Sequence, residues 1–186
     1  MVWSVTSNDE EAAIFEILET GSPRIVAIVG SAILERRLEH SLKFRLRRGN
    51  TVNKLFKPTG AFGSFGVKID LGYVLQMYGK DEHSALTGIS EIRNLFAHRL
   101  DISFGAECVK EPMAKLKLHT QRSHYPEPHW DSDSEIEIEP PENDIGVFRI
   151  NLRIALALLT RDQLRHRPWS NEATNLTFSP PMEISF

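Results

Sequence analysis

The sequence predicts an all-α protein, a single helical bundle of four to five helices with an acidic disordered insertion. Apolar residues recur every three or four positions over several segments, which is the helical period, and strand-like alternation is rare. These segments begin after Ser, Pro or Asp and end at Gly, as helices do. The chain has 186 residues, 41% of them hydrophobic and 25% charged, which suits one domain with one core.

The first predicted helix is the segment "DEEAAIFEILET", from Asp9 to Thr20. Ser7 or Asn8 can cap its start, and Gly21 ends it. Its apolar residues fall at helical spacing: Ile14, Phe15, Ile17 and Leu18. We therefore expect one side of this helix to face the core.

The longest predicted helix spans about residues 23 to 48, with Ser22 as its cap, Pro23 as its first residue and Gly49 after its end. An apolar stripe runs along it through Leu34, Leu38, Leu42 and Leu46. A basic row lies roughly opposite, formed by Arg36, His40, Lys43 and Arg47. This row is either the solvated face of the helix or a surface that binds a polyanion such as RNA.

We expect residues 50–63 to form a connection that contains one helical turn. Three turn-forming residues fall close together in this segment: Pro58, Gly60 and Gly63. A third helix is expected from about residue 64 to 78, with Gly79 ending it. Gly66 and Gly72 inside it each cost about 1 kcal/mol relative to Ala. Their presence predicts that another helix packs very close to this one.

A fourth helix is predicted to begin at Asp81 and to run to the segment "RNLFAH". After it, Pro112 limits the chain to two short helical pieces at most. A last helix, "IGVFRINLRIALALLTRDQLRHR", is expected to pack on the bundle through its apolar residues, which are Phe148, Leu152, Leu156 and Leu159.

The charge of the chain is unevenly distributed. The segment from Asp131 to Asp144 has seven acids and no Lys or Arg, which leaves 18 acids against 22 bases elsewhere. Residues 1–119 plus 145–166 are expected to form the helical bundle domain, 120–144 an acidic disordered linker and 167–186 a flexible tail. The acidic segment either stays solvated or lies across a basic face and competes with a polyanion.

Composition also excludes several classes of protein. A single cysteine, Cys108, excludes an internal disulfide framework, and acids near the start are unlike a signal peptide, so we expect a cytoplasmic protein. The apolar runs are shorter than the roughly 20 residues that a membrane span needs, so we expect no membrane span. We expect no cofactor and no metal, since phosphate-loop motifs are absent and the evenly spaced histidines lack cysteine partners: His119, His124 and His129.

The segment "EIRNLFAHRLD" combines residue types that can cleave RNA without a metal. Asn94 and His98 lie four residues apart and share a helical face, and Arg93 is on the adjacent row. A histidine can move the 2′-hydroxyl proton, and an arginine can stabilise charge on phosphorus. Asn94 would hold the imidazole or a phosphate oxygen, and Asp70 on the preceding helix would orient Arg93 or His98.

A purely structural interpretation of the same segment stays open. A histidine near the end of a helix is stabilised by the helix dipole and can bind the last carbonyls. An arginine that faces an acid on a neighbouring helix forms a partly buried ion pair that fixes the register of the two helices.

The run from Gly60 to Phe104 resembles proteins of the mannitol operon repressor family, with a "KIDLGY" helix followed by "IRNLFAH" and a segment that ends in Ser-Phe. The stretch "SPRIVAIVGSAILERRLEHSL" is similar to the first long helix of that family. The resemblance covers about residues 10–119. It implies a non-enzymatic, all-helical regulator in transcription. No helix-turn-helix is recognisable, so we expect contact with a protein partner or a homodimer, not direct DNA binding.

The spacing R-N-x-x-x-H is also similar to the HEPN superfamily, helical bundles of which many are metal-independent ribonucleases and others bind RNA or protein. Those ribonucleases are often dimers in which two motifs face one cleft. By this resemblance, Arg93 would stabilise the phosphate, Asn94 would be its polar companion and His98 the acid and base. The sequence thus leaves three candidates: a regulator, a ribonuclease that uses Arg93 and His98, and a passive RNA-binding module.

Overall fold

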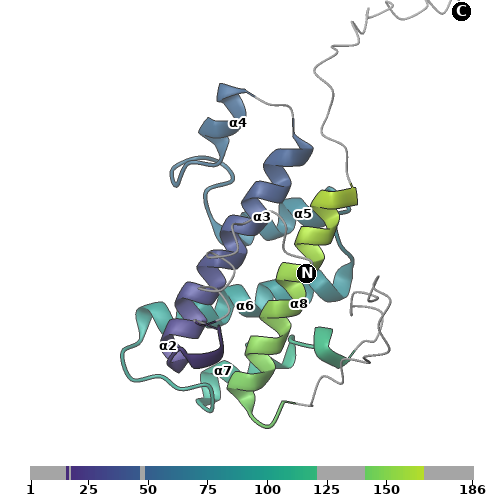
Figure 1. Cartoon of the computed structure of the whole chain (residues 1–186). Coiled ribbons are helices and arrows are strands. Elements are labelled where there is room, and N and C mark those ends of the chain that lie inside the picture. The colour runs from purple at the N-terminus through teal and green to yellow at the C-terminus, as the bar shows by residue number, and fades with distance from the viewer. Residues whose placement is uncertain (1–15, 17, 47–48, 121–140, 166–186) are drawn as a thin grey trace, which may run out of the picture.

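The computed structural model describes residue 16 and residues 18–46, 49–120 and 141–165, which fold into helices with no strand (Figure 1). The predicted all-α class is confirmed. The elements are α2 (Pro23–Ile25), the π-helical segment η1 (Val26–Gly30), α3 (Ser31–Arg45), α4 (Asn50–Leu55), α5 (Phe65–Val74), α6 (Lys80–His98), α7 (Glu107–Ala114), the 3-10 turn η2 (Leu118–Thr120) and α8 (Asp144–Arg165).

Several predictions concern residues outside these ranges. They are most of the first helix with its candidate caps Ser7 and Asn8, most of the acidic linker, Arg47 of the basic row, and the tail at 167–186. Of the first helix, Glu16 and residues 18–20 are described and are helical, and Leu18 is buried.

The long helix predicted at 23–48 is continuous from Pro23 to Arg45 but changes its winding at η1. Ser22 caps it, since its hydroxyl accepts a hydrogen bond from the backbone N–H of Ile25 at 3.4 Å. The helix stops at Leu46, whose backbone is extended. Leu34, Leu38 and Leu42 of the predicted apolar stripe are buried at 0% exposure, whereas Leu46 lies past the end of the helix and is only partly buried.

The third helix is shorter than predicted, because α5 ends at Val74. Gln76 adopts the left-handed conformation at φ 55°, and the chain then turns back so that the Tyr78 hydroxyl donates to the Ile69 carbonyl at 2.6 Å. Gly79 does not end this helix. It lies at the start of α6, where its N–H donates to the Glu82 carboxylate at 3.0 Å.

Close helix packing occurs at glycines other than the two predicted. A Cβ added at Gly66 would meet nothing within 4 Å, and one at Gly72 would meet the Tyr78 ring, which belongs to the same turn. The close approaches between helices are at Gly30, where a Cβ would lie 2.6 Å from Leu152, and at Gly88. The prediction for Gly66 and Gly72 was therefore wrong.

Pro112 lies inside α7 and does not divide it. The break comes three residues later, at Lys115, where the chain leaves the helix for η2. Pro112 is buried against α6, with its carbonyl oxygen 2.6 Å from a Cβ built at Gly88.

The helices form two layers around one core (Figure 1). α3 and α8 run side by side in front, while α5 and α6 lie behind and α7 closes the lower end. The predicted apolar residues of α8 are all buried: Phe148, Leu152, Leu156 and Leu159. In the described part of the chain, no helix combines the length and the apolar character that a membrane span needs.

Candidate functional site

Arg93 and Asn94 line an open cleft of about 440 Å³ between α3, α5 and α6. The other lining residues are Glu35, Ser90 and the four residues from Gly63 to Gly66. His98, the last residue of α6, is exposed and is not part of the cleft lining. The structure thus brings together two of the three motif residues and leaves the histidine apart.

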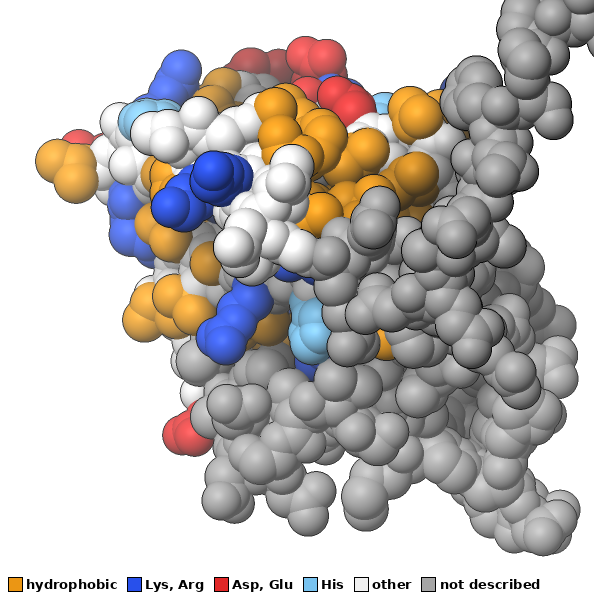
Figure 2. All heavy atoms as spheres, turned by 90° about the horizontal axis from the view of Figure 1, so that it is seen from above, with side chains coloured by type: hydrophobic (Ala, Val, Ile, Leu, Met, Phe, Trp, Pro, Cys, Tyr) orange, Lys and Arg blue, Asp and Glu red, His pale blue; other side chains and the backbone are white. Residues whose placement is uncertain are grey.

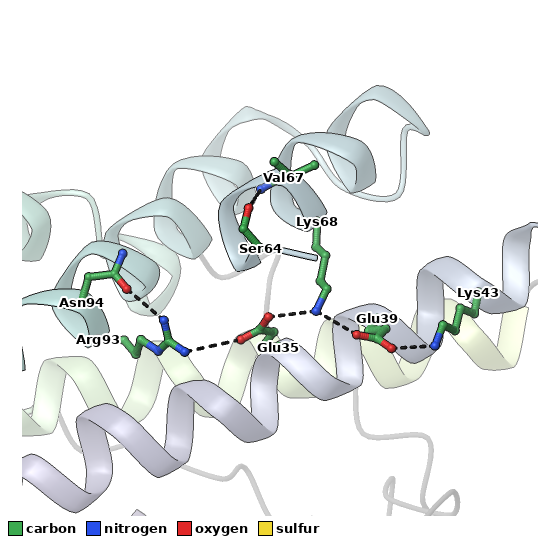
Figure 3. Close-up of polar contacts among 8 residues, drawn as sticks. All are labelled: Glu35, Glu39, Lys43, Ser64, Val67, Lys68, Arg93 and Asn94. Atoms are coloured by element: carbon green, nitrogen blue, oxygen red, sulfur yellow. Dashed lines mark hydrogen bonds and ion pairs between the residues drawn. The ribbon is translucent and has the colours of Figure 1, made fainter. Parts of the chain in front are cut away.

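Arg93 is engaged on two sides (Figure 3). Its Nη1 donates a hydrogen bond to Asn94 Oδ1 at 3.0 Å, and its Nη2 lies 3.9 Å from Glu35 Oε2 on α3. Since 37% of the Arg93 side chain is exposed, part of the guanidinium still faces the cleft. The sequence predicted Asp70 of the preceding helix beside Arg93, whereas the structure places Glu35 of α3 there.

The contacts continue from Glu35 into a charged network across α3 and α5 (Figure 3). Lys68, with 4% exposure, donates to Glu35 Oε1 and to Glu39 Oε2, both at 2.8 Å. Glu39 in turn accepts from Lys43 at 2.6 Å. We call these five side chains the charged network: Arg93, Glu35, Lys68, Glu39 and Lys43.

Pairing shifts the ionisation of the network toward the charged forms. Burial alone would raise the pKa of Glu39, but hydrogen bonds from Lys43 and Lys68 outweigh burial and lower that pKa below its ordinary value of 4.5. Burial likewise opposes the charge of Lys68, yet its bonds to Glu35 and Glu39 raise its pKa above 10.5. Both groups are therefore ionised at neutral pH.

Asp70 does not orient Arg93 or His98, as the sequence had predicted. Its carboxylate lies 2.9 Å from His83 Nε2 on α6, and the Tyr73 ring lies beside the His83 ring with 4.7 Å between the centroids. Burial, together with the nearby charge of Asp70, raises the pKa of Tyr78. The predicted role was wrong because Asp70 lies on α5 opposite His83.

The carbonyls at the end of α6 bind Arg24, not His98. The Arg24 guanidinium donates to the carbonyls of Phe96, Arg99 and Leu100. A cation at this position also interacts favourably with the negative end of the helix dipole. Sequence reasoning missed Arg24, because only the folded chain brings residue 24 next to residues 96–100.

The predicted basic row is not a continuous charged surface in the described residues. Arg36 and His40 are exposed, but Lys43 binds Glu39 and lies 5.2 Å above the Phe56 ring. On the face drawn in Figure 2, Lys and Arg side chains form separate groups among apolar and uncharged ones. The geometry gives little support to a polyanion that follows this helix.

The described residues contain no group of three side chains that could hold a metal ion. Of the spaced histidines, His119 is described, and it is half-buried with its Nδ1 2.9 Å from Asn151 Nδ2. His124 and His129 lie outside the described residues.

No protein-family model matches this chain, and it has no significant match among curated proteins or solved structures. Its function is therefore inferred from the residues of the cleft and their contacts.

Proposed function

We propose that this chain is a non-enzymatic regulator of the mannitol operon repressor type, which acts in transcriptional regulation through protein contacts. The observation that carries the proposal is the separation of the two candidate catalytic groups. Arg93 lines the cleft and belongs to the charged network, whereas His98 is outside the cleft lining. Cleavage of RNA needs a proton-transfer group and a cation at the same phosphate.

The contacts of the other motif residues support the same conclusion. Asn94 Oδ1 accepts from Arg93, and the Asp70 carboxylate pairs with His83. Neither Asn94 Oδ1 nor the Asp70 carboxylate therefore orients the His98 ring. A general base normally depends on such a partner to fix its tautomer and direction. The motif therefore acts in our proposal as a packing element of α6.

Exposed apolar side chains support a role in protein contacts. Leu100, directly after the motif, is 89% exposed, and Ile25 and Val29 are 46% and 37% exposed. Arg24 binds the Leu100 carbonyl, so the start of α2 and the end of α6 lie at the same end of the molecule. Other large apolar side chains that are exposed in the described chain lie on α5: Val67, Tyr73 and Val74. Exposed apolar side chains favour contact with another protein, and a second copy is the first case to test.

A metal-independent ribonuclease is the second candidate, because Arg93 is partly exposed in an open cleft and His98 is exposed. In a dimer, the histidine of one copy could reach the cleft of the other. This arrangement would use the same two residues but would need both chains.

One experiment separates the two candidates. The purified wild type and the His98→Ala variant are incubated with a mixed RNA pool in EDTA, and circular dichroism checks that both are folded. We expect no cleavage by the wild type. Cleavage that disappears in a folded His98→Ala variant would reverse the order of the candidates.

The protein-contact part is tested by light scattering on the wild type and on Leu100→Asp. We expect the wild type to have a mass above that of one chain, and Leu100→Asp to have a lower mass than the wild type. A wild type that stays a single chain at every concentration would exclude the homodimer and leave a different protein as the partner.

A further inference from the structure

The hydroxyls of Ser31 and Ser90 both lack a partner in the described chain, but Ser90 is the one that lines the cleft. Ser41, Thr87 and Thr160 each donate to the carbonyl four residues earlier, at 3.1, 2.8 and 2.9 Å. Ser90 is 8% exposed and lines the cleft, and within the described chain its hydroxyl has no hydrogen-bond partner. In the described residues, the side-chain atoms that are enclosed without a partner are Ser31 Oγ and Arg149 Nε. The Ser90 hydroxyl is not one of them, so it reaches the cleft and is available to a ligand there.

The start of α5 forms the opposite side of the same cleft. Ser64 caps this ten-residue helix, and its hydroxyl oxygen accepts from the Val67 N–H at 3.3 Å, which leaves the hydroxyl hydrogen available. Backbone N–H groups in the first turn of a helix lack partners within the helix and carry the positive end of its dipole. Gly66 also lines the cleft, and a Cβ built there would have no atom within 4 Å, so the space beside this residue is open.

The charged network beside this cleft has one more cation than carboxylate. It contains three cations and two carboxylates. Lys68 lies 2.8 Å from each carboxylate and Lys43 2.6 Å from Glu39, whereas Arg93 lies 3.9 Å from Glu35. Arg93 is thus the most weakly compensated cation of the network, and it is the one that lines the cleft.

We propose that this cleft binds a small phosphate compound, either inorganic phosphate or a phosphate monoester. The donors are Arg93, the Asn94 amino group, the hydroxyls of Ser64 and Ser90, and the first turn of α5. These donors outnumber what the two oxygens of a carboxylate can accept, and an arginine beside a helix N-terminus suits a phosphate. Glu35 in the cleft wall disfavours a polymer with several phosphates.

This site goes beyond the proposed regulator, because it would give the protein a small-molecule ligand. It does not depend on His98 and involves no cleavage. Binding at the cleft and the absence of ribonuclease activity are therefore separate results, and either can fail without the other.

The test is a titration of the full chain with inorganic phosphate at constant ionic strength, followed by NMR of the backbone amides and by calorimetry. We expect one saturable site, with shifts at the amides of Phe65, Gly66 and Ser90. Arg93→Gln should weaken binding at least about tenfold, and Ser90→Ala about fivefold, as expected for the loss of one charged and one neutral hydrogen bond. Arg36→Gln removes the same charge from an exposed position of α3 outside the cleft and should bind as the wild type does.

Three further ligands define the class. Methyl phosphate that binds at least as well as inorganic phosphate would indicate a monoester, and weaker binding would indicate free phosphate. Acetate that binds equally well, or a short RNA that binds more tightly and depends on Arg93, would overturn the proposal. The absence of saturable phosphate binding by the folded wild type would also overturn the proposal. The same holds for an Arg93→Gln variant that is folded by circular dichroism and binds phosphate like the wild type. Ser90→Ala keeps the site testable if Arg93→Gln does not fold.

Discussion

Lys68 is the most buried charged residue in the described chain, and its two carboxylate partners explain how it can lie there. An unpaired ammonium would be costly at 4% exposure, whereas one shared between Glu35 and Glu39 is compensated. The two glutamates lie four residues apart on α3, so they form one acidic edge that faces α5. The network thus fixes how α5 lies on α3.

The stability that Glu39 provides should depend on pH. Since the pKa of Glu39 is lowered in the folded state, its contribution is complete above the ordinary value of 4.5 and is lost as the pH falls through the folded value. We expect Glu39→Gln to lower the free energy of unfolding by about 1 kcal/mol at pH 7, a low figure for charged hydrogen bonds because 26% of the side chain is exposed. Urea unfolding between pH 7 and 3 should show this difference shrinking below about pH 4.5.

Glu107→Gln is the matched control for that measurement. Glu107 pairs with Lys110 at an exposed position, with 85% of its side chain accessible, and such pairs contribute little. Its effect on the free energy of unfolding at pH 7 should be small. A difference for Glu39→Gln that stays constant down to pH 3 would contradict the role of its ionisation.

At the scale of the element, the sequence predicted the helices well where a cap or an apolar stripe marks them. Ser22 caps its helix as expected, the predicted apolar residues of α8 are buried, and so are three of the four in the predicted stripe of α3. Ser64, expected as the first residue of its helix, is the cap. The π-helical segment η1 and the early end of α5 could not be predicted. The first lies where Gly30 meets Leu152 of α8, and the second depends on the Tyr78 hydroxyl reaching the Ile69 carbonyl, so both depend on tertiary contacts.

The candidate site shows the same limit. Helical spacing placed Arg93 and Asn94 on adjacent rows of α6, and both line the cleft, whereas His98 does not and Ser90 was not recognised as a site residue. Glu35, which pairs with Arg93, and Lys68, which pairs with Glu35, come from other helices, at positions that no local pattern singles out. A sequence motif predicts which residues share a helical face, but the packing decides what they face.

Two glycines in different helices should respond in opposite ways to the same substitution. Gly66→Ala adds a Cβ where nothing lies within 4 Å and should stabilise the protein by about 0.5–1 kcal/mol, because alanine loses less backbone entropy. Gly88→Ala puts a Cβ 2.6 Å from the Pro112 carbonyl oxygen and 3.0 Å from Lys115 Cβ, and should cost about 1–3 kcal/mol. Thermal unfolding of both variants measures the difference, and a stabilising Gly88→Ala would show that α7 can move away from α6 freely.

At the scale of the whole molecule, α8 completes a core that the earlier helices begin. It packs against α3, α6 and η2, although residues 121–143 separate it from η2 along the chain. Asn151, with 0% exposure, joins the two parts: its Oδ1 accepts from the Leu118 N–H at 2.8 Å, and its Nδ2 donates to the Val147 carbonyl at 2.8 Å. A polar residue in this position fixes the register of α8 against η2.

Asn151→Ala should therefore destabilise the molecule as a whole and not α8 alone. The change leaves the buried Leu118 N–H without a partner, for which we expect a loss of about 2–3 kcal/mol in the free energy of unfolding. Hydrogen exchange of α6 and α8 amides should show both helices losing protection by the same amount, because their core residues unfold together. Arg153→Ala, which removes an exposed pair with Glu19 from the same helix, should change protection by less than about 1 kcal/mol. Loss of protection confined to α8 would mean that α8 docks on an independently stable bundle, since the remaining helices would then hold their core without it.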